Sequence, residues 1–324
     1  MTFFWGGFIL LLVLLVMTGI AILASAYART IRTSHTRLAS LGSHLLETDS
    51  GMIEYARVGN GYPVLVVHGA MGGFDHGLWV AQGFKVSDYQ LISISRFGYL
   101  RSAVPPGASL NLQADAFAQL LDEIGIQKVV VFAISAGSTS AIRFTARYPE
   151  RVAALVLVGP DSPGKEQMPM PPRIVFETIL RSDFLFWVLF TFFETWMQNS
   201  MGLAPKGFPI TTENRALIKQ FLAGAMPISK RMNGLIYDSY LAVNEFNESV
   251  MESSPYPLGA IKVPVLVVHA LDDPLAIAEN VQALAELFPH MRRCAIPDGG
   301  HFFFGHMEEV TTEIQQFIRS HLEE

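Results

Sequence analysis

Short apolar segments with the pattern of buried strands alternate with segments of helical periodicity along most of this chain. A strand buried on both faces is a continuous apolar run, as in Val64-Leu65-Val66-Val67. An amphipathic helix places apolar residues three or four positions apart, as in residues 112–124. This alternation predicts an α/β fold with a mostly parallel sheet and helices on both faces. The strand-like segments are 52–58, 64–67, 91–95, 128–134, 152–158, 263–269 and 293–296, and the helix-like segments are 112–124, 139–148, 275–287 and 308–321.

An uncharged run occupies residues 3–28. As a helix it would reach about 39 Å at about 1.5 Å per residue, which is enough to cross a hydrocarbon core of about 30 Å. Trp5 and Tyr27 lie near its ends, where aromatic rings favour the membrane interface. The run predicts a transmembrane anchor over residues 1–28, with a lipid bilayer as its partner.

The charges that flank this run predict its orientation. Arg29, Arg32 and Arg37 follow it, and no basic side chain precedes it. The positive-inside bias then places the rest of this single-pass membrane protein on the cytoplasmic side. A cleaved signal peptide is the alternative, because Ala24-Ser25-Ala26 resembles a cleavage site, although the basic opening segment of a signal peptide is missing. The polar residues 29–44 are expected to form a linker.

Charge and cysteine content exclude several classes of function. The net charge of -6 provides no basic footprint, so nucleic acid is not expected as a partner. A single cysteine, Cys294, excludes an internal disulfide and a four-cysteine metal site. Asp75 and His76 adjoin, but no second pair of ligands follows at a suitable spacing, and no metal is expected.

Residues 161–257 interrupt the alternation of strands and helices. They contain many prolines and a group of aromatic side chains between residues 184 and 196. We expect a helical cap here, inserted between a first core segment (45–160) and a second (258–324). The aromatic rings would form an apolar substrate pocket, the cap's own core, or a contact with the bilayer. The candidate substrate-binding rings are Phe186, Trp187 and Phe190.

Ser135 lies between a buried strand and a helix. A serine at such a turn projects its Oγ from the carboxyl edge of the sheet, and the turn requires small neighbours. Ala133 and Gly137 meet that requirement, and the following helix offers its N–H groups to a developing negative charge. An ordinary turn serine is the alternative, but the strand-to-helix placement favours a nucleophile.

A serine nucleophile needs a base, and the base needs an acid. His301 lies in a glycine-rich loop between the last strand and the last helix, from which it can reach a neighbouring strand. Asp272 and Asp273 follow the strand-like segment 263–269 and point in different directions, so one of them is expected to meet His301. We favour Asp273, with Asp272 holding the turn or capping a helix and Asp161 as a further alternative.

The negative charge that forms on the substrate oxygen needs two N–H donors. Ala136, next to the nucleophile, would supply one. The second is expected from Ala70 in the loop His68-Gly69-Ala70-Met71-Gly72-Gly73, whose glycines let the backbone approach a substrate. A glycine-rich connector without this role is the alternative.

In this order, these motifs resemble the α/β-hydrolase superfamily over about residues 45–324. The matching segments are His68-Gly69, Arg96-Phe97-Gly98-Tyr99-Leu100-Arg101-Ser102, the turn around Ser135, Asp272-Asp273-Pro274 and Gly299-Gly300-His301. The resemblance implies a mostly parallel eight-stranded sheet with a cap after the sixth strand, and an acid three residues after Ala270, which is Asp273. Ala133 replaces the usual glycine and Phe97 a frequent proline. Serine rather than aspartate at residue 135 argues against an epoxide hydrolase or a haloalkane dehalogenase.

The expected activity is therefore acyl transfer from a carboxylic ester with a hydrophobic acyl or alkyl group. Ser135, His301 and Asp273 would form the triad, Ala70 and Ala136 the oxyanion hole, and no cofactor is needed. The alternatives are hydrolysis of a carbon–carbon bond, a lactonase or a perhydrolase on the same triad, or a member that binds without catalysis.

Overall fold

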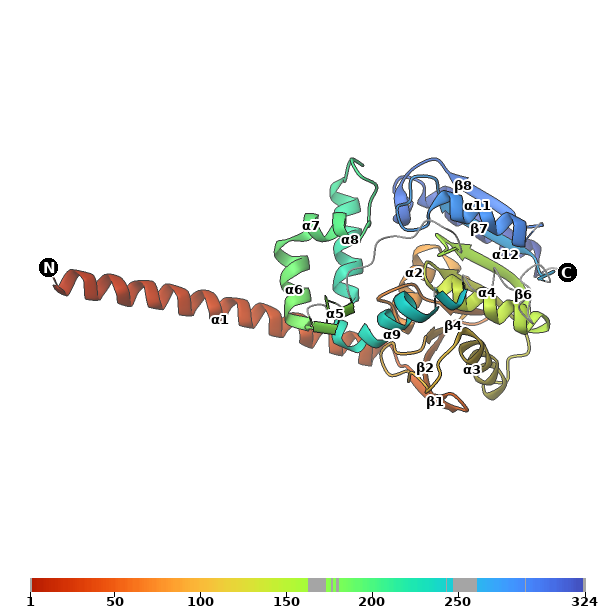
Figure 1. Ribbon diagram of the computed structural model, residues 1–324, viewed down its shortest axis with the longest axis horizontal. Coiled ribbons are helices and arrows are strands. Elements are labelled where there is room, and N and C mark those ends of the chain that lie inside the picture. The colour runs from red at the N-terminus through yellow and green to blue at the C-terminus, as the bar shows by residue number, and fades with distance from the viewer. Residues whose placement is uncertain are drawn as a thin grey trace.

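Eight strands form a single sheet in a computed structural model of the protein (Figure 1). The structure describes residues 2–162, 173–175, 177–178, 181–242, 244–246, 261–288 and 290–322. The strands are β1 (His44–Thr48), β2 (Gly51–Val58), β3 (Pro63–Val67), β4 (Gln90–Ser95), β5 (Val129–Ile134), β6 (Val152–Val158), β7 (Val265–Ala270) and β8 (Arg292–Ile296). Their order across the sheet is β1-β2-β4-β3-β5-β6-β7-β8.

The sheet is parallel from β4 to β8, and β1 and β2 pair antiparallel at one edge. Each of the seven strand-like segments forms a strand, so the predicted mostly parallel sheet is confirmed. The additional strand, β1, has largely exposed or half-buried side chains and therefore lacks the apolar run that marks the others. Its register is set by the turn that joins Thr48 to Gly51, where Gly51 adopts a φ of 93°.

Helices cover both faces of the sheet. Alternate residues of β3 point to opposite faces of the sheet. Leu65 and Val67 belong to one core cluster, and Val64 and Val66 belong to the other. The first cluster packs under α3 and α4, and the second under α2 and α12. These helices are α2 (Phe74–Gly83), α3 (Leu110–Glu123), α4 (Gly137–Arg147) and α12 (Met307–Ser320), with α11 (Ala278–Leu287) packed in the first cluster.

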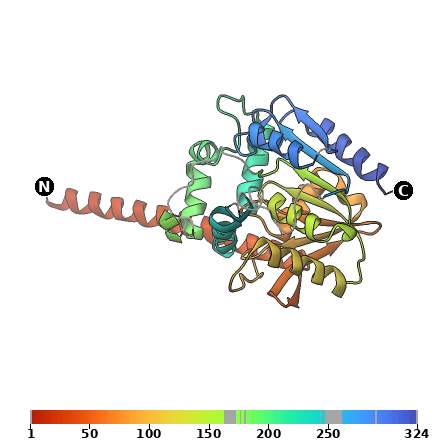
Figure 2. The same cartoon turned by 45° about the vertical axis from the view of Figure 1, so that its right-hand side comes forward.

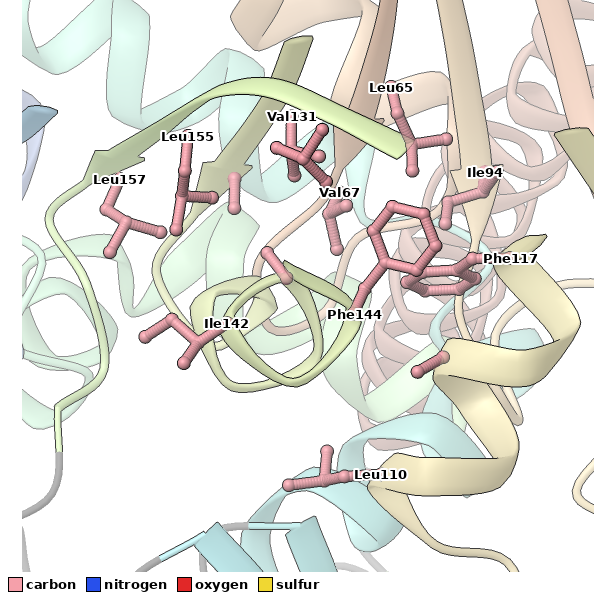
Figure 3. Packing of buried hydrophobic residues seen from close by; sticks show 14 of the residues in the cluster. Leu65, Val67, Ile94, Leu110, Phe117, Val131, Ile142, Phe144, Leu155 and Leu157 are labelled. Carbon is pink, nitrogen blue, oxygen red and sulfur yellow. The ribbon is translucent and has the colours of Figure 1, made fainter. Parts of the chain in front are cut away.

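The first cluster shows how closely helices and sheet interdigitate. Leu65 and Val67 of the sheet lie beside the rings of Phe117 on α3 and Phe144 on α4 (Figure 3). The two ring centroids are 6.0 Å apart in an edge-on arrangement. Because α4 follows the nucleophile turn directly, this packing holds the turn against the sheet.

A single helix, α1 (Thr2–Ser40), contains 39 residues. Most of the segment 29–44, which was expected to be a linker, is therefore helical. Its C-terminal part stays helical because it packs on the rest of the protein: Tyr27 contacts cap rings, and Arg37 donates to buried Asp75. The N-terminal part projects away from the sheet (Figures 1 and 2). Among the described residues, α1 is the one helix long and apolar enough to cross a membrane.

The cap helices lie together at the end of the molecule nearest α1 (Figures 1 and 2). They include α6 (Asp183–Phe192), α7 (Glu194–Ser200), α8 (Thr212–Gly224) and α9 (Met232–Tyr237), after the short α5 (Arg173–Val175). Parts of the predicted cap, 163–172 and 247–260 among them, fall outside the described residues. The described helices fall between β6 and β7, where the insertion was expected.

Candidate active site

Ser135 occupies the turn between β5 and α4 in a left-handed backbone conformation, with a φ of 50°. Such a φ is costly for a residue with a side chain and persists because the surroundings impose it. The Ser135 N–H donates to the carbonyl of Val158, and its carbonyl accepts from the N–H of Asp161. A Cβ atom at Gly137 would lie 2.5 Å from the carbonyl oxygen of His68, so glycine is required there.

His301 and Asp273 form the hydrogen-bonded pair that the sequence favoured. The distance from His301 Nδ1 to Asp273 Oδ2 is 2.7 Å, and Asp273 Oδ1 accepts from the N–H of Leu275. Because a carboxylate accepts, Nδ1 carries the proton and leaves Nε2 as the basic nitrogen. Burial alone would lower the pKa of His301, but the charge of Asp273 and their hydrogen bond raise it above the usual value.

The pairing with His301 also shifts the pKa of Asp273. Burial would raise the pKa of Asp273, yet the charge of His301 and the hydrogen bonds from His301 and the backbone hold it below its usual range. The carboxylate therefore stays ionised wherever the histidine works as a base. This is the electrostatic arrangement that a serine nucleophile requires.

The loop after β6 brings the pair close to the nucleophile. Gly159, at a φ of 52°, lies against the histidine, since a Cβ there would be 3.1 Å from His301 Cε1 and 3.6 Å from Asp273 Oδ2. Two residues later, the N–H of Asp161 donates to the Ser135 carbonyl at 3.2 Å. The three expected triad members therefore gather at one edge of the sheet.

The two alternative acids have other positions. Asp272 accepts hydrogen bonds from the N–H groups of Gly299 (3.2 Å) and Gly300 (2.9 Å), so it holds the loop that carries His301. The carboxyl of Asp161 is close enough for its charge to raise the pKa of His301. Burial, followed by the neighbouring charge of Asp238, raises the pKa of Asp161 itself to about 6.

The expected oxyanion loop lies against the nucleophile. A Cβ added to Gly69 would be 3.0 Å from Ser135 Cβ, which brings the backbone of Gly69 and Ala70 beside the serine. Ala136 follows Ser135 directly and stands at the N-terminus of α4. The two chain segments expected to donate N–H groups are thus adjacent.

Buried Arg96 supports this loop, a role that sequence reasoning missed. The Arg96 N–H donates to His68 Nε2 at 3.0 Å, so the other ring nitrogen carries the proton that faces the Gly69 carbonyl. Burial and the charge of Arg96 hold the pKa of His68 well below its usual value. The Arg96 guanidinium in turn makes paired bonds of 2.5 and 2.6 Å to Asp238 of the cap. The Arg-x-Gly segment was the available signal, but its partner is 142 residues away.

A second buried charge cluster was also missed. Asp75, at the start of α2, accepts from Arg37 of α1 and from Arg231 of the cap. Arg231 also donates to the carbonyl of Gly72 in the oxyanion loop. The two guanidinium groups hold the pKa of Asp75 far below its usual value against the effect of burial. This carboxylate, a candidate metal ligand by its residue type, therefore binds two arginines.

The three rings expected to bind substrate lie in or at the margin of the cap's core. Phe186 and Trp187 are buried in the cap's own core, and Phe190 is half-buried with its ring centroid 5.7 Å from that of Phe186. The Trp187 ring packs 5.6 Å from Tyr27 of α1. Phe186 and Trp187 therefore pack in the cap's own core, which is one of the alternatives that the sequence left open for these rings.

One apolar cluster joins α1, the cap and the loops that carry the candidate active site. It includes Tyr27 and Ile31 of α1, the cap core, Met71 after β3, and Phe304 after β8. Phe302, directly after His301, stacks on Phe304 with centroids 5.5 Å apart. The candidate triad therefore has an apolar cluster beside it on the side of the cap, in addition to the charged groups of Asp161, Arg96 and Asp238.

Comparisons with known proteins agree with this fold. A family model described as the alpha/beta hydrolase fold matches residues 62–306. An uncharacterized hydrolase, YcgS of Bacillus subtilis, is 40% identical over 113 residues, covering 34% of this chain and 38% of that protein. A 2-hydroxy-6-oxononadienedioate/2-hydroxy-6-oxononatrienedioate hydrolase of Burkholderia vietnamiensis is 33% identical over 128 residues, covering 37% of this chain and 44% of that protein. The chain thus spans less than half the length of each of these relatives.

A solved structure described as a bacterial membrane phospholipase A is similar along the whole chain. The alignment covers 100% of both chains, with a TM-score of 0.60 and 19% identity. At 19% identity, this similarity supports a shared fold and nothing further.

Proposed function

Because the chain belongs to the α/β-hydrolase family and is a hydrolase, we propose that it is a serine esterase for substrates with a hydrophobic acyl or alkyl group. The observation that carries the proposal is the 2.7 Å bond between His301 and Asp273 beside Ser135, which is held in a left-handed turn. A positioned base, its acid and a strained serine at the sheet edge are the parts that acyl transfer needs.

The reaction would proceed in two steps. His301 Nε2 takes the proton of Ser135 as Oγ attacks the ester carbonyl carbon, and the N–H groups of Ala70 and Ala136 stabilise the oxyanion. The protonated histidine then gives its proton to the leaving alcohol. In the second step His301 removes a proton from water, the hydroxide attacks the acyl-enzyme, and Ser135 recovers its proton as the acid leaves. Asp273 keeps the ring oriented throughout.

The apolar surroundings support a hydrophobic substrate. Met71, Phe302 and Phe304 lie in or against the cluster that continues into the cap. An alkyl chain bound beside these side chains would leave water at a gain of about 0.8 kcal/mol per buried methylene. Phe190, half-buried at the margin of the cap core, remains our candidate among the cap rings for contact with that chain.

We propose further that α1 anchors the protein in a membrane with the hydrolase domain on the cytoplasmic side. Its most apolar 18-residue window is unburied, with a mean hydropathy of 2.9. The helix runs through the small residues near Ala26 and packs on the cap at Tyr27, which supports an anchor that is retained. Arg29 and Arg32 are exposed just beyond the apolar run and provide the positive-inside signal. The solved structure that aligns over the whole chain is likewise described as a membrane phospholipase.

Carbon–carbon bond hydrolysis is the second candidate. The Burkholderia relative is named for acting on 2-hydroxy-6-oxo dienedioates, and its identity to this chain is 33% over the aligned part. Such substrates are dianionic, whereas the candidate triad lies beside the carboxyl of Asp161 and an apolar cluster shared with the cap. The ester is therefore the favoured substrate.

Hydrolysis of p-nitrophenyl esters of increasing chain length tests the proposal. We expect the purified full-length protein in detergent to cleave them, with kcat/KM rising from acetate to medium-chain esters. The Ser135→Ala variant is the control and should lose at least about a thousandfold in kcat. Equal rates for the two proteins would refute an enzyme that uses Ser135, and cleavage of a dienedioate alone would favour the second candidate.

A further inference from the structure

The cap has an exposed apolar surface formed by Phe184, Leu185, Phe192, Phe193 and Trp196. These side chains belong to α6, α7 and the residue that joins them, and each is between 41% and 58% exposed. Single exposed apolar residues are ordinary, but five in a stretch of 13 residues, four of them aromatic, mark a contact surface. We call this set the cap's apolar surface.

Both acidic side chains of α6 and α7 are engaged elsewhere. Asp183 accepts from the N–H and the hydroxyl of Ser229, each at 2.8 Å. Glu194 pairs with Lys219 of α8 at 3.1 Å and is 13% exposed. The two helices contain no basic residue. Their exposed side is thus apolar or uncharged, as a helix in contact with lipid requires.

The cap's apolar surface lies next to the end of the apolar run of α1. The ring of Tyr27 meets the ring of Phe184 edge-on, with centroids 5.3 Å apart, and lies 5.6 Å from that of Trp187. Figures 1 and 2 show α6 beside α1 and running across it, on the side of the domain that faces the N-terminus. A bilayer crossed by α1 would extend across that helix at the level of α6.

The length of α6 determines how it can meet such a bilayer. Its 10 residues reach about 15 Å, half of a hydrocarbon core of about 30 Å. It is too short to span the core, whereas a helix of this length can lie in the interface with its apolar side among the acyl chains. Phenylalanine and tryptophan are suited to that depth.

We propose that the cap's apolar surface lies in the interface of the bilayer that α1 crosses, so that the cap is docked on lipid as a second contact beside the anchor. The inference rests on the anchor that forms part of the proposed function. It adds a membrane-binding surface on the cap and predicts its residues. In this orientation the cap, and the apolar cluster that leads to the candidate catalytic loops, face the lipid phase.

Site-directed spin labelling of the full-length protein tests this docking. Cys294 is the sole cysteine, so Cys294→Ser provides a background in which Phe193→Cys or Trp196→Cys carries a single nitroxide. The matched control is Glu123→Cys at the exposed end of α3. After reconstitution in vesicles of phosphatidylcholine and phosphatidylglycerol, we expect labels at 193 and 196 to collide with oxygen and to be at least about fivefold less accessible than the control to a nickel chelate.

Each outcome has a distinct meaning. If the protein floats with the vesicles but all three labels meet the nickel chelate equally, the docking is wrong while the anchor stands. If the protein does not float, the anchor and the docking are both wrong. Esterase activity on a soluble ester is measured on the same samples, so that a failure of the proposed catalysis can be distinguished from a failure of the docking.

A functional variant provides the second measurement. Phe193→Ser combined with Trp196→Ser changes exposed side chains, so folding and hydrolysis of soluble p-nitrophenyl butyrate should be unchanged. Hydrolysis of a long-chain ester embedded in vesicles should fall roughly tenfold, because the cap loses its apolar contact. The matched control is Thr191→Ser combined with Thr195→Ser, which alters exposed uncharged positions on the same helices. An equal loss on soluble and embedded esters would overturn the docking role.

Discussion

Arg37, on the last turns of α1, donates a 2.5 Å hydrogen bond to the buried carboxylate of Asp75 beside the oxyanion loop. The same carboxylate accepts from Arg231 of the cap, which also holds the carbonyl of Gly72. One aspartate thus links α1, the hydrolase core and the cap. Two arginines around one carboxylate leave a net positive cluster, and a nitrogen of each arginine donates to the backbone carbonyl of Gly224.

Replacing Arg37 should weaken the protein without unfolding it. In Arg37→Gln, Asp75 keeps Arg231, but the charged hydrogen bonds to Asp75 and Gly224 are lost, at a cost of about 1.5–3 kcal/mol. The thermal midpoint measured in detergent should fall by several degrees. Arg32→Gln, at an exposed position on the same helix, is the control and should stay close to wild type. Equal midpoints for the two variants would contradict the buried contact.

Removing the carboxylate should be more damaging. Asp75→Asn leaves the guanidinium groups of Arg37 and Arg231 near each other without a counter-charge, and we expect a loss of about 3–5 kcal/mol in unfolding free energy. The double variant Asp75→Asn with Arg37→Gln removes one of the two cations and should recover part of that loss. Thermal unfolding of the single and double variants measures the recovery, and a strictly additive loss would argue against charge repulsion as the cause.

The adjacent aspartates should differ sharply in their effect on catalysis. Asp273→Asn removes the acceptor that fixes the His301 tautomer, so kcat should fall about 10,000-fold, as for the acid of other Ser-His-Asp sites. Asp272→Asn weakens the bonds to Gly299 and Gly300 and should cost about tenfold, through a less well-held histidine loop. Steady-state kinetics with one ester measures both. A larger loss for Asp272→Asn would reverse their roles.

Asp161 should shift the pH dependence of activity. The pKa of His301 lies above its usual value, partly through the charge of Asp161, and the base must be neutral to work. The acid limb of kcat/KM should therefore have its midpoint above pH 6.5. In Asp161→Asn that charge is absent, so the pKa of His301 falls and the limb moves to lower pH. The pH profile of Ser138→Ala, at a buried neighbour in α4, is the control, and a limb that stays fixed in Asp161→Asn would show that this carboxylate does not act on the histidine.

Local patterns were sufficient to predict the sheet, the strand-to-helix turn at Ser135 and the long apolar helix. A buried strand is recognised from its own residues, as at Val129–Ile134, because burial on both faces demands a continuous apolar run. The Ser135 turn is equally local, since Ala133 and Gly137 are small for steric reasons that act within a few residues. The edge strand His44–Thr48 was missed because exposure removes that pattern.

The sequence by itself determined the order of strands along the chain, the serine and histidine candidates and the long apolar run near the N-terminus, since each depends on neighbours in the chain. The tertiary structure decided which aspartate meets His301, because Asp272 and Asp273 differ in direction and not in local composition. It also decided that Arg37 pairs with the buried carboxylate of Asp75: its partners Asp75 and Gly224 are 38 and 187 residues away, and contacts at such separations leave no local pattern.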